Sequence, residues 1–304
     1  MKSWLWKGML AATIALPALS GVARAQSHDD DGCTNATLKG DYAFSVIDFS
    51  VPQVVVGIKT FDGKGKFTQR DYGGDSLRTT GQTDFSTEGQ ETGTYKVNPD
   101  CTGSAEIHLN VPGVPPGTSH GVIKIAFAIS GGGRAFHEVV AEFTPPGATQ
   151  PVPTQTRADD WKVGSDDDGC TNATLQGDYA FVVTDFALPQ VVAVVGKFDG
   201  KGKYTQVDYI GDSLRTMGAT SFRGGETGSY TVNPDCTGSQ EIKLNIPGVP
   251  PGTSHGVIEN MFVISGAGRS IHAVIAELTP PGGTQPVPTQ GRVDFWKVGS
   301  EQDN

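Results

Sequence analysis

This sequence has little positive charge, and that shortage excludes some classes of binding partner. It carries 23 lysines and arginines against 33 aspartates and glutamates. Three of the basic residues, Lys2, Lys7 and Arg24, precede the expected start of the mature chain, which leaves 20 basic residues and a net charge near −13. Such an acidic chain repels the phosphate backbone of nucleic acids and anionic lipid surfaces. We therefore expect no nucleic-acid partner and no binding to membrane surfaces.

Long hydrophobic runs are also scarce, and the longest lies near the start of the chain. Basic residues open the sequence, an apolar run follows, and an A-x-A motif ends at Ala25. This order is typical of a secretory signal that is cleaved before Gln26. A membrane anchor is the competing interpretation, but Pro17 interrupts the run, which falls short of the roughly 20 residues that a spanning helix needs. We expect residues 1–25 to be a signal peptide and the mature chain to be periplasmic or extracellular, without membrane insertion.

The sequence has only four cysteines, and none of them forms a C-x-x-C pair. An even number of cysteines in an exported chain, without metal-binding spacing, predicts disulfides. Three connectivities can be drawn. The simplest joins Cys33 to Cys101 and Cys170 to Cys236, because each half of the chain then closes on itself.

Two acidic runs offer oxygen ligands for a metal ion. "HDDDGC" begins at His28 and "SDDDGC" at Ser165, and calcium prefers such ligands. Neither run matches the D-x-[DN]-x-[DN]-G loop with its distant glutamate, so a solvated acidic segment is the better interpretation. The sequence predicts no metal site and no cofactor.

The dominant feature of the sequence is an internal duplication. "DDGCTNATLKGDYAF" begins at Asp30 and returns as "DDGCTNATLQGDYAF" at Asp167, and the correspondence continues to "WKVG" at Trp161 and Trp296. Each repeat is about 130 residues long, which is enough to bury a core of its own. We expect two tandem domains, residues 26–164 and residues 165–304.

Within each repeat the pattern predicts strands and almost no helix. Short stretches rich in β-branched and aromatic residues are separated by glycine and proline turns. The Asp-Gly pair in "FDGKGKF" from Phe61 is the clearest hairpin signal, and alternation places Tyr42, Phe44 and Val46 on one face of the first strand. The predicted fold class is all-β, with two tandem antiparallel eight-stranded β-barrels. A barrel of this size is either filled by side chains or holds one small ligand.

The strand count decides where the connections lie. In the first repeat we expect strands over residues 41–49, 53–61, 65–72, 77–85, 91–97, 103–110, 121–130 and 134–143. The loop "NVPGVPPGTSHGV" from Asn110 returns almost unchanged from Asn245, and this count places it at the base of the barrel, opposite the acidic residues described below. One inconsistency remains. Cys33 and Cys101 fall at opposite ends, so either residues 34–40 run along the barrel or the count is off by one.

Three stretches carry a resemblance. "CTNATLKGDYAF", "FDGKGKF" and "GTYKVNPDCTG" resemble recurrent motifs of uncharacterised exported bacterial proteins, over the whole of each repeat. The eight-strand plan resembles the calycins, the group that includes lipocalins and allene oxide cyclase. That resemblance implies a calycin-like barrel with an internal cavity. The lipocalin G-x-W signature is absent near either first strand, and no cyclase residue can be placed on this sequence, so no reaction is implied.

Acidic residues gather at one predicted rim of each barrel. In an up-and-down barrel Asp48, at the end of the first strand, shares a rim with Asp71 and Tyr72, at the end of the third, and "GDSLR" adds Asp75 and Arg78. The second repeat keeps Asp185, Asp208, Tyr209, Asp212 and Arg215. These ten residues are the predicted ligand-binding residues, because converging carboxylates orient polar ligands. The alternative is a solvated rim with turn-capping aspartates and one ion pair.

Histidine is the second candidate for chemistry. His137 and its counterpart His272 lie in the predicted last strand, and we expect His137 to share the cavity face with Val139, Ala141 and Phe143. A hydrogen-bonded core histidine is the alternative. No serine or cysteine nucleophile accompanies these histidines, so the sequence identifies no catalytic residue.

Two classes of function remain. The first is an exported, non-catalytic binding or interaction protein that holds a small apolar molecule in a barrel cavity. The second is a small-molecule isomerase or cyclase of the allene oxide cyclase-like barrel type. The expected partner in either case is a small hydrophobic molecule, and oligomerisation is left open. An open apolar pocket lined by Asp48 and Asp71, rather than a filled barrel, would support a ligand.

Overall fold

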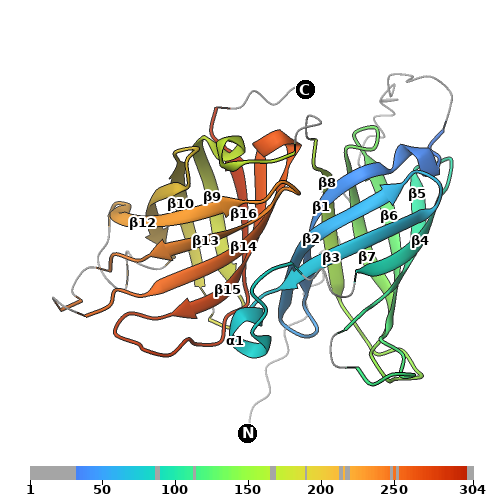
Figure 1. The fold of residues 1–304 in the computed structure, drawn as a ribbon, viewed down its shortest axis with the longest axis horizontal. Coiled ribbons are helices and arrows are strands. Elements are labelled where there is room, and N and C mark those ends of the chain that lie inside the picture. Colours follow the sequence, from blue (N-terminus) through green and yellow to red (C-terminus); the bar gives the residue numbers. More distant parts are fainter. Residues whose placement is uncertain are drawn as a thin grey trace, which may run out of the picture. The chain divides into compact units, whose positions relative to one another are not determined.

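The computed structural model contains two closed antiparallel barrels of eight strands each (Figure 1). It describes residues 32–85, 90–111, 114–164, 169–188, 190–211, 215, 220–246, 249–250 and 253–299. The all-β tandem-barrel prediction is therefore confirmed, whereas the expected signal peptide, residues 1–25, lies outside the described residues. No helix in the described ranges is long and apolar enough to cross a membrane.

The first barrel is an up-and-down meander in which each strand pairs with its neighbours in sequence and β8 closes on β1. Its strands are β1 (Lys39–Asp48), β2 (Gln53–Asp62), β3 (Lys66–Gly73), β4 (Glu91–Val97), β5 (Thr102–His108), β6 (Val122–Ser130), β7 (Ala135–Thr144) and β8 (Thr156–Lys162). A 3-10 turn, η1 (Asn35–Thr37), precedes β1, and a short helix, α1 (Ser76–Thr80), lies between β3 and β4.

The second barrel repeats this plan and closes by the pairing of β16 with β9. Its strands are β9 (Gly177–Asp185), β10 (Gln190–Phe198), β11 (Lys203–Ile210), β12 (Arg223–Val232), β13 (Thr237–Lys243), β14 (Val257–Ser265), β15 (Ser270–Thr279) and β16 (Gly291–Lys297). Two 3-10 turns, η2 (Asn172–Leu175) and η3 (Gly266–Gly268), complete it.

The predicted fourth strand, residues 77–85, is wrong. Its first part forms α1, which ends where Gly81 adopts the left-handed conformation (φ 73°) and donates its amide to the Leu77 carbonyl at 3.2 Å. Glycine ends helices in this way because it has no Cβ to clash. The eighth strand is instead β8, a segment that the sequence analysis placed beyond the barrel.

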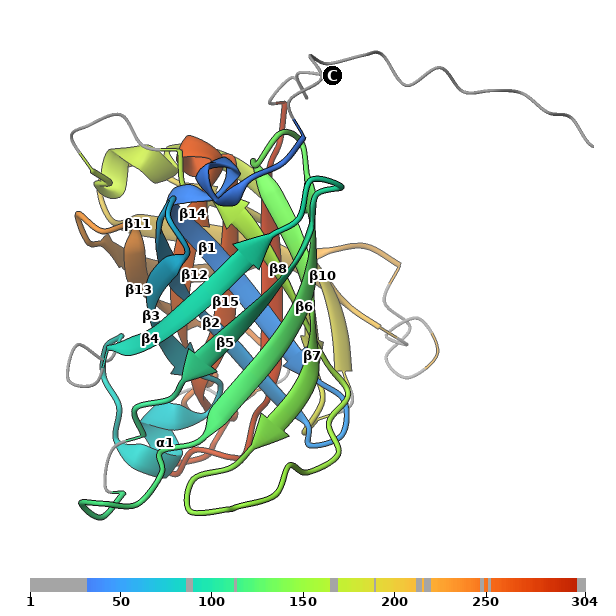
Figure 2. The same ribbon diagram turned by 90° about the vertical axis from the view of Figure 1, so that its right-hand side faces the viewer.

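This correction moves the copied loop to the other end of the barrel. Figure 2 shows α1 and the connection between β5 and β6 at one end of the first barrel and η1 at the other. The β1–β2 turn, the β3–β4 connection and the β7–β8 connection share the end that carries α1, because successive strands alternate in direction. We call it the α1 end, and the opposite one the η1 end. The copied loop does not close the base of the barrel away from the acidic residues, as we expected, but lies at their end.

The same correction explains the cysteines. Cys33 precedes β1 and Cys101 lies in the β4–β5 turn, so both are at the η1 end, where they form a disulfide with a Cα–Cα distance of 4.9 Å. Cys170 and Cys236 form the equivalent disulfide in the second barrel. The predicted pairing within each repeat is confirmed.

Aromatic side chains fill the interior at the η1 end. Phe61 packs against Tyr42, Phe67 and Tyr95 with ring centroids 5.4, 5.1 and 5.0 Å away, and all four rings are at least 95% buried. The "DGKG" turn holds this end as predicted, since Asp62 Oδ1 accepts hydrogen bonds from two backbone amides within that hairpin. The cavity of this barrel lies on the α1 side of the aromatic base.

Candidate ligand-binding cavities

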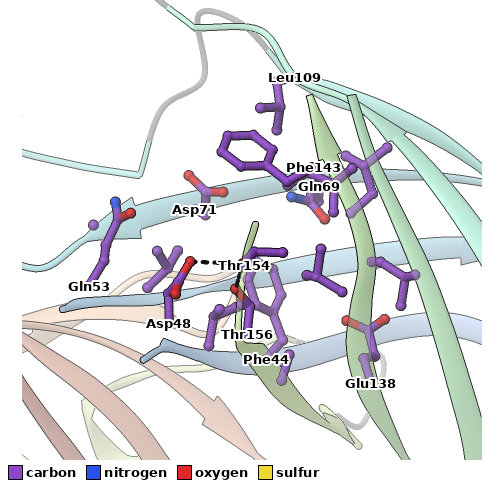
Figure 3. A pocket seen from close by; sticks show the side chains of 18 of the residues that line it. Phe44, Asp48, Gln53, Gln69, Asp71, Leu109, Glu138, Phe143, Thr154 and Thr156 are labelled. Atoms are coloured by element: carbon purple, nitrogen blue, oxygen red, sulfur yellow. Dashed lines mark hydrogen bonds between the residues drawn. The ribbon is translucent and has the colours of Figure 1, made fainter. Parts of the chain in front are cut away.

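Each barrel contains a cavity between its aromatic base and the α1 end or its equivalent. The first has a volume of about 380 Å³ and the second about 280 Å³, near the lower end of the range for small-molecule sites. The walls of the first are mainly apolar, and its polar groups come from a few positions of β1, β2, β3, β7 and β8, of α1 and of the β7–β8 connection (Figure 3). An interior of this kind accommodates a hydrocarbon or aromatic body and one polar group.

The copied loop contributes to the border of both cavities. Leu109 and Val111 of the β5–β6 connection line the first cavity, and Leu244 and Ile246 line the second. The β7–β8 connection adds Pro146 to the first. Among the described residues, one position of the copied loop itself borders each cavity, and it is the position at which the two copies differ, Val111 in the first and Ile246 in the second.

The structure brings some of the predicted site residues together at the cavities. Asp48 and Asp71 line the first cavity, and Asp185 and Asp208 line the second. Of the remaining predicted residues, Asp212 lies outside the described residues.

The structure places the other predicted residues away from the cavities. The Tyr72 hydroxyl donates to the Gln82 carbonyl at 2.7 Å, on the outer side of the β3 wall. Arg78 Nε donates to Asp75 Oδ1 at 2.9 Å beside α1, which is the ion pair that the alternative interpretation expected. Neither pair lines the first cavity, and neither Tyr209 nor Arg215 is among the described residues that line the second.

Asp48 is a turn-capping residue as well as a cavity residue. Its Oδ1 accepts hydrogen bonds from the Ser50 amide at 2.8 Å and the Val51 amide at 3.2 Å, and its Oδ2 accepts one from Thr154 Oγ1 at 3.1 Å (Figure 3). Burial raises the pKa of Asp48, but hydrogen bonds from the Ser50 and Thr156 hydroxyls and from the Ser50 and Val51 amides outweigh it and hold the pKa below its usual value. Asp185 accepts the same kind of amide bonds in the second barrel. Both aspartates therefore hold their turns in place, mainly through Oδ1.

The cavity contains a charged cluster that the sequence analysis missed. Lys59 Nζ donates to Glu138 Oε2 at 2.7 Å and to Asp160 Oδ1 at 2.9 Å, and these side chains are 2%, 6% and 0% exposed. The ammonium lies 4.6 Å from the centre of the Phe44 ring, a cation–π distance. Phe44 can lie there because Gly57 has no Cβ, which would overlap the ring.

The charges in this cluster depend on one another. Burial favours the neutral amine, but the carboxylates of Asp160 and Glu138 raise the pKa of Lys59 above its ordinary value. Burial, and then the neighbouring Glu138, raise the pKa of Asp160 well above its ordinary value. The cluster therefore holds Lys59 charged, and it contains more carboxyl groups than cations.

The second barrel has none of these three charges. Alignment of the repeats places Gly196 at the position of Lys59, Ala273 at that of Glu138 and Phe295 at that of Asp160. The Tyr204 ring occupies the space beside Gly196, where a Cβ would overlap its hydroxyl. All three residues of the cluster therefore differ together between the repeats. Comparison of the two repeats at interior positions would have revealed it from the sequence.

A second polar group is common to both barrels. In the first, Gln69 Nε2 donates to Glu91 Oε2 at 2.5 Å, next to Asp71 on the same strand. Burial raises the pKa of Asp71 to about 6, although the charge of Lys59 opposes this. Burial and then the charge of Asp71 raise the pKa of Glu91 to about 8. The two carboxyl groups therefore influence each other, and their pKa values lie on either side of neutrality.

The second barrel neutralises the corresponding carboxylates with its own arginine. Arg223 Nη2 donates to Asp208 Oδ2 at 2.9 Å and lies 3.5 Å from Glu226 Oε1. Gln206 Nε2 donates to Glu226 as Gln69 does to Glu91, and the Tyr204 hydroxyl donates to Gln206 Oε1 at 2.7 Å. Within the described residues, the acidic pair is therefore ion-paired with an arginine in the second barrel and with no cation in the first.

The prediction that His137 faces the cavity is wrong. Its side chain is 54% exposed and its Nδ1 lies 2.8 Å from Asp159 Oδ1, while Glu138 points inward. Val139 is likewise 55% exposed. Phe143 does line the cavity, because a register shift between β6 and β7 inserts one extra residue and reverses the alternation.

The raised pKa values of Asp71 and Glu91 predict a pH dependence. A carboxyl with a folded pKa above its unfolded value of about 4 contributes stability that is complete below that value and is lost as the pH rises. The free energy of unfolding of the first barrel should therefore fall between pH 5 and pH 9, as the pH passes about 6 and then about 8. Urea denaturation across this range measures it. The Glu91→Gln variant should lack the fall in stability above pH 7. A wild-type stability that rises between pH 5 and pH 9 would contradict the raised pKa values of Asp71 and Glu91.

Comparisons with known proteins give only distant likenesses. No protein family matches the chain, and no curated protein matches it either. A protein of unknown function from the DUF3598 family of Nostoc punctiforme aligns over 90% of this chain and 100% of its own, with 9% identity and a TM-score of 0.26. CghA in complex with Sch210972 aligns over 84% and 87%, with 10% identity and a TM-score of 0.23. Likenesses at this level carry no inference about fold or function.

Proposed function

We propose that this is an exported, non-catalytic binding protein in which each barrel holds a small, mainly apolar molecule. The observation that supports it is the pair of cavities, each between an aromatic base and the repeated loop. A barrel selected only for stability gains by filling its interior, because each empty volume costs packing energy. Free space at the same place in both repeats is better explained by a ligand.

Export and the domain organisation belong to the same proposal. The two disulfides suit an oxidising compartment, and the start of the sequence has the order of a secretory signal. We place the domains at residues 26–164 and 165–304 and regard the barrels as calycin-like, since each is a closed eight-stranded meander.

A filled-cavity variant tests the binding function. Ile107 lines the first cavity and Ile242 lines the second at the equivalent position, so Ile107→Trp and Ile242→Trp form a matched pair. With decanol as the probe, isothermal titration should show two sites per wild-type chain and one in either variant. The added indole costs about 1–3 kcal/mol of stability through overpacking, which thermal denaturation monitors. Absence of decanol binding by the folded wild-type chain, together with no small molecule released on denaturing protein from its native source, would refute the proposal.

An isomerase or cyclase remains the second candidate. The observation in its favour is the Asp71 carboxyl group at the cavity, because burial raises its pKa to about 6 and a carboxyl group that titrates near neutrality can exchange a proton with a bound molecule. Mass spectrometry of the molecule recovered from wild-type protein and from Asp71→Asn distinguishes the two candidates. An isomerised product that appears only with the wild type supports the enzyme, and an identical molecule in both supports binding.

A further inference from the structure

We propose that the first barrel binds an organic ammonium ion, a protonated amine attached to an apolar body, and that the second barrel does not. This rests on the proposed binding function, which it makes specific for one cavity. The Asp71 carboxylate and the amide oxygen of Gln69 are the groups that would accept hydrogen bonds from the ammonium. Figure 3 shows both side chains following one another along β3 and facing the cavity.

The second barrel shows what the carboxylate pair binds. There the guanidinium of Arg223 contacts both Asp208 and Glu226. The first barrel keeps both carboxyl groups as Asp71 and Glu91 but has no cation in the place of Arg223. The corresponding connection, residues 86–89, reads Ser-Thr-Glu-Gly, so the sequence itself supplies none there. A ligand cation would restore in the first barrel the pairing that the second makes internally.

Gln69 gives a second, independent observation. Its side chain is 5% exposed and lines the cavity, and its Oε1 has no hydrogen-bond partner among the described residues. Leaving a buried polar atom without a hydrogen-bond partner costs free energy. The corresponding oxygen of Gln206 accepts a hydrogen bond from the Tyr204 hydroxyl. The first repeat has Phe67 in place of that tyrosine, so the acceptor is available to a ligand.

Lys59 does not fill the cation position. Its ammonium donates to Glu138 and Asp160, and no ion pair joins it to Asp71 within the described part of the chain. Glu138 and Asp160 are thus already paired with a cation, whereas no ion pair to the Asp71 carboxyl is found among the described residues.

The rest of the cavity decides between an organic ammonium and a metal ion. The described residues contain no group of three histidine, cysteine, aspartate or glutamate side chains placed to hold a metal. The walls of this cavity are mainly apolar, with Val55, Leu109 and Phe143 among them. A two-acceptor site inside an apolar cavity suits an ammonium group that carries a hydrocarbon or aromatic body.

The test measures the binding of three probes of equal hydrocarbon length to the mature, disulfide-bonded protein. Decylamine is a cation at pH 7, decanol is neutral and decanoate is an anion. The Ile242→Trp variant leaves the first cavity open. In this variant, titration calorimetry should show that decylamine binds at least about 10-fold more tightly than decanol. The preference for decylamine over decanoate should be larger still. Asp71→Asn should remove this preference while decanol affinity is kept, which also shows that the variant is folded. Asp41→Asn, which changes an exposed aspartate on the outside of the same barrel, should keep the preference.

The outcomes separate this inference from the proposed function. Equal affinity for the three probes, or a preference unaffected by Asp71→Asn, would overturn the ammonium site but leave the cavity as a binding site. Absence of binding by all three would remove both. Binding of calcium, magnesium or zinc alone that competes with decylamine and depends on Asp71 would replace the organic ammonium by a metal ion and also overturn the inference.

Discussion

Replacing Lys59 by methionine should destabilise the first barrel by about 3–5 kcal/mol, the usual cost of removing one partner from a buried ion pair. Methionine is close to lysine in length and keeps the packing against Phe44, so the loss reports the charge. Glu138 and Asp160 would remain 6% and 0% exposed without a cation. Both then have to be protonated or hydrated inside the barrel, and each of these changes costs free energy.

The second repeat supplies the control for this variant. The triple substitution Lys59→Gly, Glu138→Ala and Asp160→Phe copies the residues that the second barrel has at these positions. It should recover most of the stability lost in Lys59→Met, because replacing a whole buried charge cluster by apolar groups is often neutral or stabilising. Urea denaturation of the three proteins measures the effect. If Lys59→Met is as stable as the wild type, the cluster is not an ion-paired unit and the carboxyl groups are already neutral.

The pH dependence of the Lys59→Met variant gives a further check on the same prediction. Loss of the lysine leaves burial and the second carboxyl to raise the pKa of Asp160 further above its usual value. A raised folded pKa contributes stability at low pH and loses it as the pH rises. The difference between Lys59→Met and the wild type should therefore be smaller at pH 5 than at pH 8.

Several features of the fold could be predicted from the sequence because they depend on local rules. The "DGKG" hairpin needs glycine at positive φ, and Gly63 and Gly65 have φ values of 74° and 113°. The alternation of Tyr42, Phe44 and Val46 follows from the period of a strand, and these side chains do point into the barrel. The disulfide pairing followed from the repeat itself. Each of these predictions needed only residues that are close in sequence, or the comparison of the two repeats.

The errors arose where tertiary structure decides between similar local patterns. Residues 77–85 contain threonines and a phenylalanine that suit a strand, yet the first of them form α1. Gly81 was the available signal for a helix end. One miscounted strand then reversed the end assigned to every later connection, which is why the copied loop was misplaced. The inconsistent positions of Cys33 and Cys101 already indicated this error.

The candidate site was predicted only in part, for a related reason. Aspartates next to turns can be seen in the sequence, so Asp48 and Asp71 were identified, but Asp48 also caps its turn. The buried charges were missed because a lysine in a strand normally faces solvent. Lys59, Glu138 and Asp160 lie on three strands, β2, β7 and β8, and β8 was not predicted. Their proximity requires the closure of the barrel.

The second large effect should come from the disulfide of the first barrel. Replacing Cys33 and Cys101 by serine removes a link between residues 68 positions apart, and the chain-entropy estimate for a loop of that length is about 4 kcal/mol. The bond holds the segment that precedes β1 against the β4–β5 turn, over the aromatic base. The variant should still fold, because η1 keeps other contacts: the Val97 amide donates to Asn35 Oδ1 at 2.8 Å and the Tyr95 hydroxyl to the Asn35 carbonyl at 2.9 Å.

The matched substitution of Cys170 and Cys236 should cost the second barrel nearly the same, since its loop spans 66 positions and η2 makes an equivalent bond from the Val232 amide to Asn172 Oδ1. Urea denaturation with and without a thiol reductant measures both effects. In the wild type, the reductant should lower the stability of each barrel to the value found in the variant that lacks the disulfide of that barrel. In the variant, the unfolding transition of the barrel without a disulfide should not respond to the reductant. A loss below about 1 kcal/mol in both variants would mean that the unfolded chain is already restricted near these residues, because the bond acts by reducing the freedom of the unfolded state.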